Sequence, residues 1–148
     1  MKLFSYVIMP DHLHLIVLPL EYQGKNQTIS DLMRDFKKFT SKRITEKLKQ
    51  MNHEDLLAFF SRSAEPYKRQ IYKVWDEGFF DENIFTQEFL NQKIQYIHYN
   101  PVRKSLAKDP EDYYYSSAKN FVGLKEFALE VDELDFFGLR DTIPKTSI

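Results

Sequence analysis

The chain of 148 residues contains no cysteine. A disulfide framework, a zinc–thiolate centre and a thiol nucleophile are therefore excluded. No apolar run approaches the roughly 18 residues that are needed to span a bilayer. The N-terminus also lacks a basic segment followed by a long apolar stretch, which is the mark of an export signal. We therefore expect a cytoplasmic protein that does not contact a membrane.

An excess of positive charge is also missing, because 21 Lys and Arg stand against 22 Asp and Glu. DNA-binding proteins are typically strongly basic, because neutralisation of the DNA phosphates supplies much of their binding affinity. Basic residues are nevertheless concentrated between positions 34 and 49, whereas the segment after Phe121 is acidic. A local DNA-binding face and an ordinary solvated helix surface both fit this pattern. The candidate phosphate contacts are Arg34, Lys37, Lys38, Lys42 and Arg43.

Length and composition indicate one globular domain. Hydrophobic residues make up 43% of the chain and aromatic residues 16%, which is enough for a packed core. There is no internal repeat or low-complexity tract. We expect a single domain over residues 1–140, followed by a disordered tail at 141–148.

Two short β-rich segments, Phe4–Met9 and His12–Leu18, are predicted to form strands joined by a tight turn at Pro10-Asp11. Side chains alternate faces in a strand, so His12 and His14 should point the same way while Leu13 points into the core. Two imidazoles side by side can hold one divalent metal ion if a third ligand is available. A half-exposed sheet edge is the competing interpretation.

A helix is predicted from Thr86 to about Asn100, because Pro101 cannot continue the hydrogen-bond ladder. Its spacing of apolar residues indicates a face turned to the core, formed by Leu90, Ile94 and Ile97.

Tyr96 and Asn100 lie four residues apart, so they should be neighbours on one flank of this helix. A phenol would then lie one turn from an amide oxygen that can ligate a metal. Packing of Tyr96 at the rim of the core is the alternative. His98 should point away from Tyr96, which favours a structural role for it.

The remaining elements are predicted from caps and spacing. A long helix should begin with Ser30 as its N-cap and run to about Gln50, and a shorter one should run from Asn52 to Phe60. Extended segments are expected at Tyr72–Trp75 and Phe79–Phe85, and the aromatic run Tyr113–Tyr115 is expected to cap the domain.

Three motifs together resemble one protein family. They are Tyr-Val-Ile-Met-Pro-Asp-His-Leu-His-Leu-Ile-Val from Tyr6, Tyr-Ile-His-Tyr-Asn-Pro-Val-Arg from Tyr96, and Asp-Pro-Glu-Asp-Tyr-Tyr-Tyr-Ser-Ser-Ala from Asp109. In order and spacing they are similar to the single-tyrosine HUH transposases, in particular the REP-associated tyrosine transposases and small insertion-sequence transposases. HUH denotes His-hydrophobic-His.

The resemblance implies a ferredoxin-like α+β fold, an antiparallel sheet with helices on one face. It further implies Mg²⁺ or Mn²⁺ as cofactor, single-stranded and hairpin-forming DNA as substrate, and a covalent 5′-phosphotyrosine intermediate. Tyr96 would be the nucleophile, and His12, His14 and Asn100 would hold the metal. Arg103 and Lys104 follow the helix end, where they can contact the DNA backbone. Asp11 either orients a ligand or simply forms the turn.

Members of that family normally have a further strand and helix ahead of the His-x-His strand, so the expected fold is N-terminally shortened. Three functions remain open on the sequence. The first is an active transposase, as a monomer or homodimer. The second is a remnant that binds DNA hairpins without turnover, and the third is an unrelated metallohydrolase in which water is the nucleophile.

Overall fold

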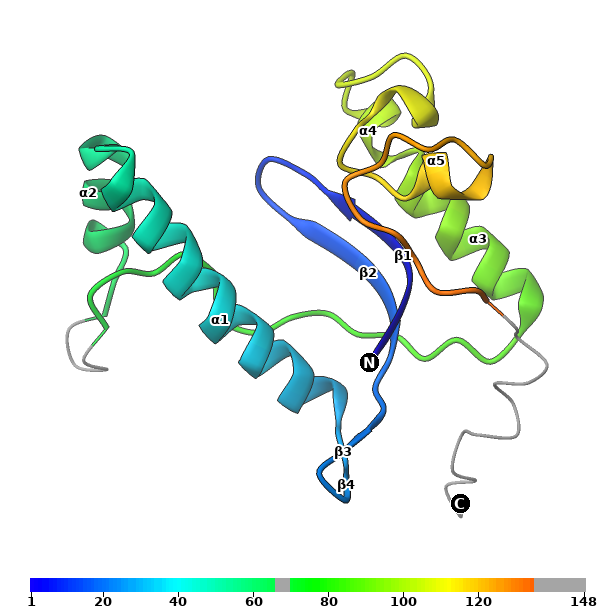
Figure 1. Ribbon diagram of the computed structural model, residues 1–148, viewed down its shortest axis with the longest axis horizontal. Coiled ribbons are helices and arrows are strands. Elements are labelled where there is room, and N and C mark those ends of the chain that lie inside the picture. The colour runs from blue at the N-terminus through cyan, green and yellow to red at the C-terminus, as the bar shows by residue number, and fades with distance from the viewer. Residues whose placement is uncertain (66–69, 135–148) are drawn as a thin grey trace. The chain divides into compact units, whose positions relative to one another are not determined.

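The computed structural model describes residues 1–65 and 70–134, and these form two compact units (Figure 1). The first unit combines Met1–Glu21 with the chain from Asn83 onward, and the second is Tyr22–Glu82. Small antiparallel sheets and separate helices make up the structure, so the predicted α+β class is confirmed. No helix in the described ranges is long and apolar enough to cross a membrane.

The first unit is built on the predicted hairpin of β1 (Lys2–Ile8) and β2 (Leu13–Leu18). The backbone N–H of Met9 donates to the carbonyl oxygen of His12 at 2.8 Å and closes the turn between the strands. In the antiparallel register Val7 pairs with His14, and Ser5 pairs with Ile16. Paired residues point to the same side of a sheet, so these four side chains share one face.

Helix α3 (Gln87–His98) covers this face of the hairpin. The side chain of Thr86 caps it by accepting the backbone N–H of Phe89 at 3.2 Å, as the sequence predicts. The predicted apolar face is also confirmed, because Leu90, Ile94 and Ile97 are each less than a tenth exposed. These residues form the core together with Phe4, Val7, Met9 and Ile16.

After Tyr99 the chain resumes a short helix, α4 (Asn100–Arg103). Pro101 lies in its first turn, where the missing N–H is not needed. The predicted break of α3 before Asn100 is therefore confirmed, but Pro101 opens a new helical turn as well as ending the old one.

The prediction that Leu13 points into the core is wrong. Leu13 is half-buried and lies outside the core cluster, whereas Ile16 is buried within it. The reason is that α3 packs on the face that carries the even-numbered residues of β2. The two histidines therefore project on the same side as Ile16, toward the layer that contains α3.

The outer edge of β1 is covered by the chain that follows α4. The backbone N–H of Ile8 donates to Tyr115 O at 2.9 Å, and the N–H of Ser117 donates to Tyr6 O at 3.0 Å. A 3₁₀ turn, η2 (Pro110–Asp112), precedes this segment and helix α5 (Ala118–Phe121) follows it. Of the aromatic run, Tyr113 packs against the core, while Tyr114 and Tyr115 remain about half exposed.

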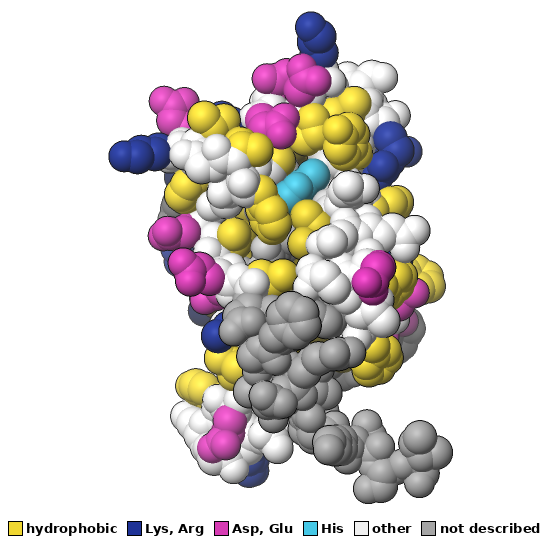
Figure 2. Space-filling model, turned by 90° about the vertical axis from the view of Figure 1, so that its right-hand side faces the viewer, with side chains coloured by type: hydrophobic (Ala, Val, Ile, Leu, Met, Phe, Trp, Pro, Cys, Tyr) yellow, Lys and Arg dark blue, Asp and Glu magenta, His cyan; other side chains and the backbone are white. Residues whose placement is uncertain are grey.

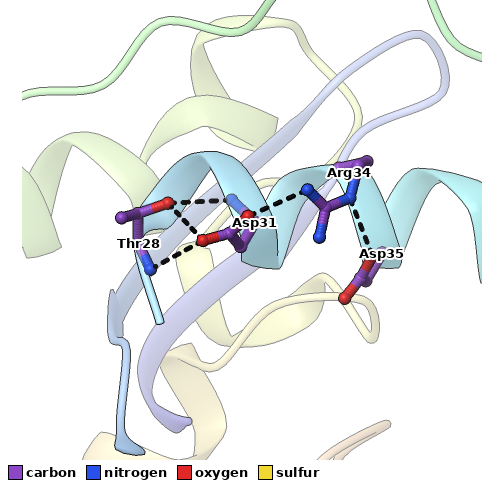
Figure 3. A network of polar contacts seen from close by, with 4 residues as sticks. All are labelled: Thr28, Asp31, Arg34 and Asp35. Carbon is purple, nitrogen blue, oxygen red and sulfur yellow. Dashed lines mark hydrogen bonds and ion pairs between the residues drawn. The ribbon is translucent and has the colours of Figure 1, made fainter. Parts of the chain in front are cut away.

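The second unit begins within a small hairpin of two-residue strands, β3 (Glu21–Tyr22) and β4 (Lys25–Asn26), and contains the helices α1 (Ile29–Gln50) and α2 (Glu54–Arg62). The N-cap of α1 is Thr28 rather than the predicted Ser30, because Thr28 forms a capping box with Asp31 (Figure 3). The N-cap position of α2 is His53 rather than Asn52.

Residues beyond α2 pack back on α1 as irregular chain. The ring of Trp75 lies 5.8 Å from that of Phe36, and its Nε1–H donates to Thr40 Oγ1 at 2.8 Å. The predicted extended segments at Tyr72–Trp75 and Phe79–Phe85 form no strand in the described chain. Gly78 has a φ of +70°, a left-handed conformation that favours glycine at this bend.

Replacing Leu90 by Ala tests the packing of α3 on the hairpin. Leu90 is 2% exposed, so the change should lower the free energy of unfolding by about 2–5 kcal/mol. Leu124→Ala is the matched control, because Leu124 is 49% exposed and the same change there should cost about 0.5 kcal/mol or less. Urea unfolding followed by circular dichroism measures both, and equal losses would contradict this core.

Candidate metal and nucleophile site

The fold brings His12, His14 and Tyr96 together, although more than eighty positions separate the tyrosine from the histidines in sequence. The ring centroids of His12 and His14 are 5.0 Å apart, with an interplanar angle of 80°. The Tyr96 ring lies edge-on to His14, with centroids 5.4 Å apart at 83°. His14 comes from β2, His12 from the turn before it, and Tyr96 from α3.

Asp11 holds the ring of His12 in place. Its Oδ1 lies 2.6 Å from Nδ1 of His12, a short hydrogen bond that lowers the pKa of the Asp11 carboxyl. Because Nδ1 is engaged, Nε2 is the nitrogen of His12 that remains for a ligand. Asp11 therefore orients a candidate ligand in addition to forming the turn.

His14 is partly buried, as His12 is. Burial lowers the pKa of His14, and the neighbouring charges of His12 and Arg103 lower it further. Its ring is therefore neutral at neutral pH, the form that offers a nitrogen lone pair to a metal. Neither nitrogen of His14 hydrogen-bonds to a residue in the described ranges.

Asn100 differs from Tyr96 in its surroundings. Asn100 is 5% exposed and Tyr96 is 48% exposed, although they lie four residues apart. The carboxamide of Asn100 makes no hydrogen bond to any residue that the structure describes, so its oxygen is available. Among the residues that the structure describes, no three His, Asp or Glu side chains lie close enough together to hold a metal ion. A third protein ligand beside the two histidines would therefore have to be a different type of side chain, such as an amide. An amide oxygen suits Mg²⁺ or Mn²⁺.

A shallow hollow beside Tyr96 is lined by polar and aromatic side chains. The guanidinium carbon of Arg103 lies 4.5 Å from the centre of the Tyr96 ring, and the guanidinium also donates to the Tyr96 carbonyl oxygen. The hollow is lined by Gln92, Gln95, Tyr96, Tyr99 and Arg103. The sequence analysis missed the two glutamines, although their helical spacing from Tyr96 and Tyr99 is the signal that could have found them.

The predicted basic residues divide between the two units. Lys104 follows α4 and lies near Asp11, where its charge helps to lower the carboxyl pKa. Along α1, Arg34 pairs with Asp31 at 2.9 Å and with Asp35 at 3.1 Å (Figure 3).

Further along α1, Lys42 and Arg43 share Glu46, at 3.9 and 3.6 Å, and Lys37 donates to backbone oxygens of Asp76 and Gly78. The positive charge of α1 is therefore partly compensated by its own carboxylates. On the face that Figure 2 shows, basic side chains likewise stand singly among acidic and apolar ones.

His98 is buried on the core side of α3, as the prediction of a structural role requires. It is 8% exposed, and its Nε2 lies 2.9 Å from Ser117 Oγ and 3.3 Å from Ser5 Oγ. Burial lowers the pKa of His98 from 6.5 to about 4. The two serines carry no local sequence signal, because each is distant from His98 along the chain.

The structure therefore holds a pair of histidines beside an exposed tyrosine on a helix. The model of the IS200-like transposase family matches residues 1–100. This match covers two thirds of the chain, and the protein therefore belongs to the IS200-like transposase family. The matched segment contains both histidines, Tyr96 and Asn100 and ends before Arg103. Comparison with curated proteins and with solved structures found no match.

The lowered pKa of His98 predicts that stability falls in mild acid. The unfolded chain binds this proton below pH 6.5 and the folded chain only below about 4. The contribution of His98 to the free energy of unfolding is therefore complete above pH 6.5 and decreases as the pH falls. Below pH 4 the protein has lost about 3 kcal/mol of stability through this group. Urea unfolding at pH 7.0, 5.5 and 4.5 measures this loss. His98→Gln is the control, since it should remove this part of the pH dependence; an unchanged dependence in that variant would contradict the assignment.

Proposed function

We propose that the protein is a metal-dependent single-stranded DNA endonuclease and strand transferase that acts through Tyr96. The observation that carries this proposal is the edge-on contact between Tyr96 and His14, whose ring shares one side of the hairpin with that of His12. Membership of the IS200-like transposase family supports DNA as the substrate and transposition as the process.

Tyr96 supplies the nucleophilic oxygen in this scheme. Its phenolic oxygen forms a bond to the phosphorus while the bond from phosphorus to the 3′ oxygen breaks. The phenol loses its proton, and the departing 3′ oxygen takes one up to become a hydroxyl. The 5′ end of the strand is then held as a phosphotyrosine. Because this ester keeps the bond energy, a second 3′-hydroxyl can reverse the step and rejoin DNA without ATP.

His12, His14 and Asn100 are the residues that would hold Mg²⁺ or Mn²⁺. Their donor atoms are two imidazole nitrogens and one amide oxygen, a set without thiolate that suits either ion. A metal bound there supplies Lewis-acid stabilisation of the charge that develops during phosphoryl transfer. Asp11 fixes the orientation of His12, and the lowered pKa of His14 keeps its lone pair free.

Unpaired bases and phosphates fit the hollow beside Tyr96. The exposed phenol of Tyr99 can stack on a base, the amides of Gln92 and Gln95 can hydrogen-bond to base edges, and Arg103 can contact a phosphate. A single strand presents such bases, so we propose that the substrate is the single-stranded part of a hairpin-forming DNA. Arg34, Lys37, Lys38, Lys42 and Arg43 of α1, with Lys104, are proposed to hold its backbone.

Replacing Tyr96 by Phe tests the nucleophile. The change removes one oxygen and keeps the ring, so it should leave the fold intact because this side chain is half exposed. Formation of a covalent protein–DNA adduct with Mn²⁺ should disappear, since no other atom in the scheme can replace that oxygen. A denaturing gel with labelled hairpin DNA detects the adduct. Tyr99→Phe is the matched control, one turn away on the same hollow, and should keep it.

The gel also separates the remaining possibilities. An adduct that persists in Tyr96→Phe would show that another exposed tyrosine attacks, such as Tyr99, Tyr114 or Tyr115. Cleavage without an adduct in the wild type would indicate a hydrolase. Binding without cleavage would indicate the DNA-binding remnant.

Removing the histidines separates metal binding from DNA binding. His12→Ala and His14→Ala should reduce cleavage by at least about 100-fold while leaving most of the hairpin affinity, because the phosphate contacts lie on other residues. Asp11→Asn should weaken Mn²⁺ binding about 10- to 100-fold, because it disturbs the orientation of His12. Calorimetric titration with Mn²⁺ and fluorescence anisotropy with hairpin DNA measure the two effects. Unchanged Mn²⁺ affinity in both histidine variants would remove this site from the scheme.

The contribution of α1 is tested by salt. Hairpin affinity should fall as the salt concentration rises, and Lys38→Ala should reduce the slope of log K against log salt by about 1 if Lys38 contacts a phosphate. Lys25→Ala, a single-charge change in β4, is the control and should leave the slope as it is. A slope that Lys38→Ala does not change would exclude this residue from the DNA interface.

A further inference from the structure

Three polar side chains from distant parts of the chain meet beneath the C-terminal end of α3. Ser5 lies in β1, His98 is the last residue of α3, and Ser117 precedes α5. Both serines have no exposed surface and His98 is 8% exposed. The oxygen of Ser117 lies 2.9 Å from Nε2 of His98 and 3.1 Å from the oxygen of Ser5. We refer to these three residues as the Ser–His–Ser anchor.

The anchor is also bonded to the backbone of β1. The backbone N–H of Tyr6 donates to Ser117 Oγ at 2.9 Å, and the N–H of Ser117 donates to Tyr6 O at 3.0 Å. Ser117 therefore connects the strand that begins the hairpin to the end of the helix that carries Tyr96. Buried polar groups of this kind specify one arrangement of their neighbours, because any displacement leaves a donor or acceptor unpaired.

The hydroxyl of Ser117 is shared among several polar neighbours. A serine hydroxyl has one proton to donate and two lone pairs that accept. Ser117 Oγ accepts the Tyr6 N–H at 2.9 Å, and it lies 2.9 Å from His98 Nε2, 3.1 Å from Ser5 Oγ and 3.2 Å from the Tyr6 carbonyl oxygen. Its one proton and both lone pairs are therefore all engaged within the anchor and β1.

We propose that the Ser–His–Ser anchor positions Tyr96 against His14 for the reaction proposed above, with His98 and Ser117 as positioning residues. His98 lies two residues after Tyr96 and two before Asn100, so it fixes the height and rotation of the helix end that presents both. Tyr96 itself is half exposed and is held mainly by ring contacts with His14 and Arg103. The buried side chain of His98 therefore fixes the position of the helix end, which the half-exposed side chain of Tyr96 does not fix by itself.

The anchor differs from ordinary core packing in what its loss should do. An apolar core residue sets whether the unit folds, whereas a directional hydrogen bond sets where the helix end lies within the fold. A misplacement of about 1 Å between reacting groups lowers a rate by about 100-fold. Loss of the anchor should therefore lower the rate of adduct formation and leave hairpin affinity nearly unchanged. This inference rests on the proposed function for its kinetic test but not for its structural one.

The kinetic test compares Ser117→Ala with Ser116→Ala. Ser116 is equally buried and adjacent, but its oxygen accepts the Ala118 N–H and touches neither His98 nor Ser5. With saturating hairpin DNA and Mn²⁺, Ser117→Ala should form adduct about 100-fold more slowly at an affinity within about threefold of wild type. Ser116→Ala should keep the wild-type rate. His98→Gln, which retains an acceptor, should lose less rate than His98→Leu.

Equal rates in Ser117→Ala and wild type, or equal losses in both serine variants, would overturn the proposal. Circular dichroism of each variant shows whether it is folded, and a variant that does not fold is replaced in the comparison by His98→Gln.

The structural test needs no activity. Nuclear Overhauser contacts in the folded wild-type protein should join the rings of Tyr96 and His14, whose centroids lie 5.4 Å apart. In Ser117→Ala the ring contacts should weaken, whereas in Ser116→Ala they should persist. Ring contacts that survive in Ser117→Ala would overturn the anchor even if the enzyme is active. Absence of any adduct in the wild type, with these contacts intact, would instead overturn the proposed function alone.

Discussion

The packing of α3 on one face of the β1–β2 hairpin is the constraint on which the site depends. Leu90, Ile94 and Ile97 are buried against that face, and Ile16 meets them from β2. Strand alternation then places His14 on the same side as Ile16, and helix periodicity places Tyr96 at the rim of the contact. The buried apolar residues thus bring together groups that are themselves partly exposed.

Electrostatics within this frame favour a neutral imidazole at His14. Burial and nearby positive charge lower the pKa of His14, and Asp11 holds His12 through one nitrogen. Arg103 lies over the ring of Tyr96, so a positive charge stands beside this exposed phenol. The overall charge of −1 says little about such a site, because a few residues within one small unit set the local field.

Local patterns in the sequence predicted most of the elements of this unit. Thr86, the Leu90–Ile97 spacing and Pro101 predicted the extent of α3, and the alternation around His12 and His14 predicted the hairpin. The prediction for Leu13 was wrong because alternation shows which residues share a face but not which face a helix covers. Ser5 and Ser117 were missed for a related reason: contacts between residues 19 to 112 positions apart leave no periodic signal. The N-caps of α1 and α2 were misplaced by one or two residues, because neighbouring polar residues compete for the same cap.

Mass spectrometry of the DNA-linked protein tests the central claim most directly. Trypsin should release residues 94–103 as one peptide, which contains Tyr96 and Tyr99 but none of the Tyr113–Tyr115 run. After reaction with hairpin DNA and Mn²⁺ and nuclease trimming, fragmentation should locate a nucleotide 5′-phosphate on Tyr96. A nucleotide on Tyr99, or on the separate peptide 109–119, would contradict the account.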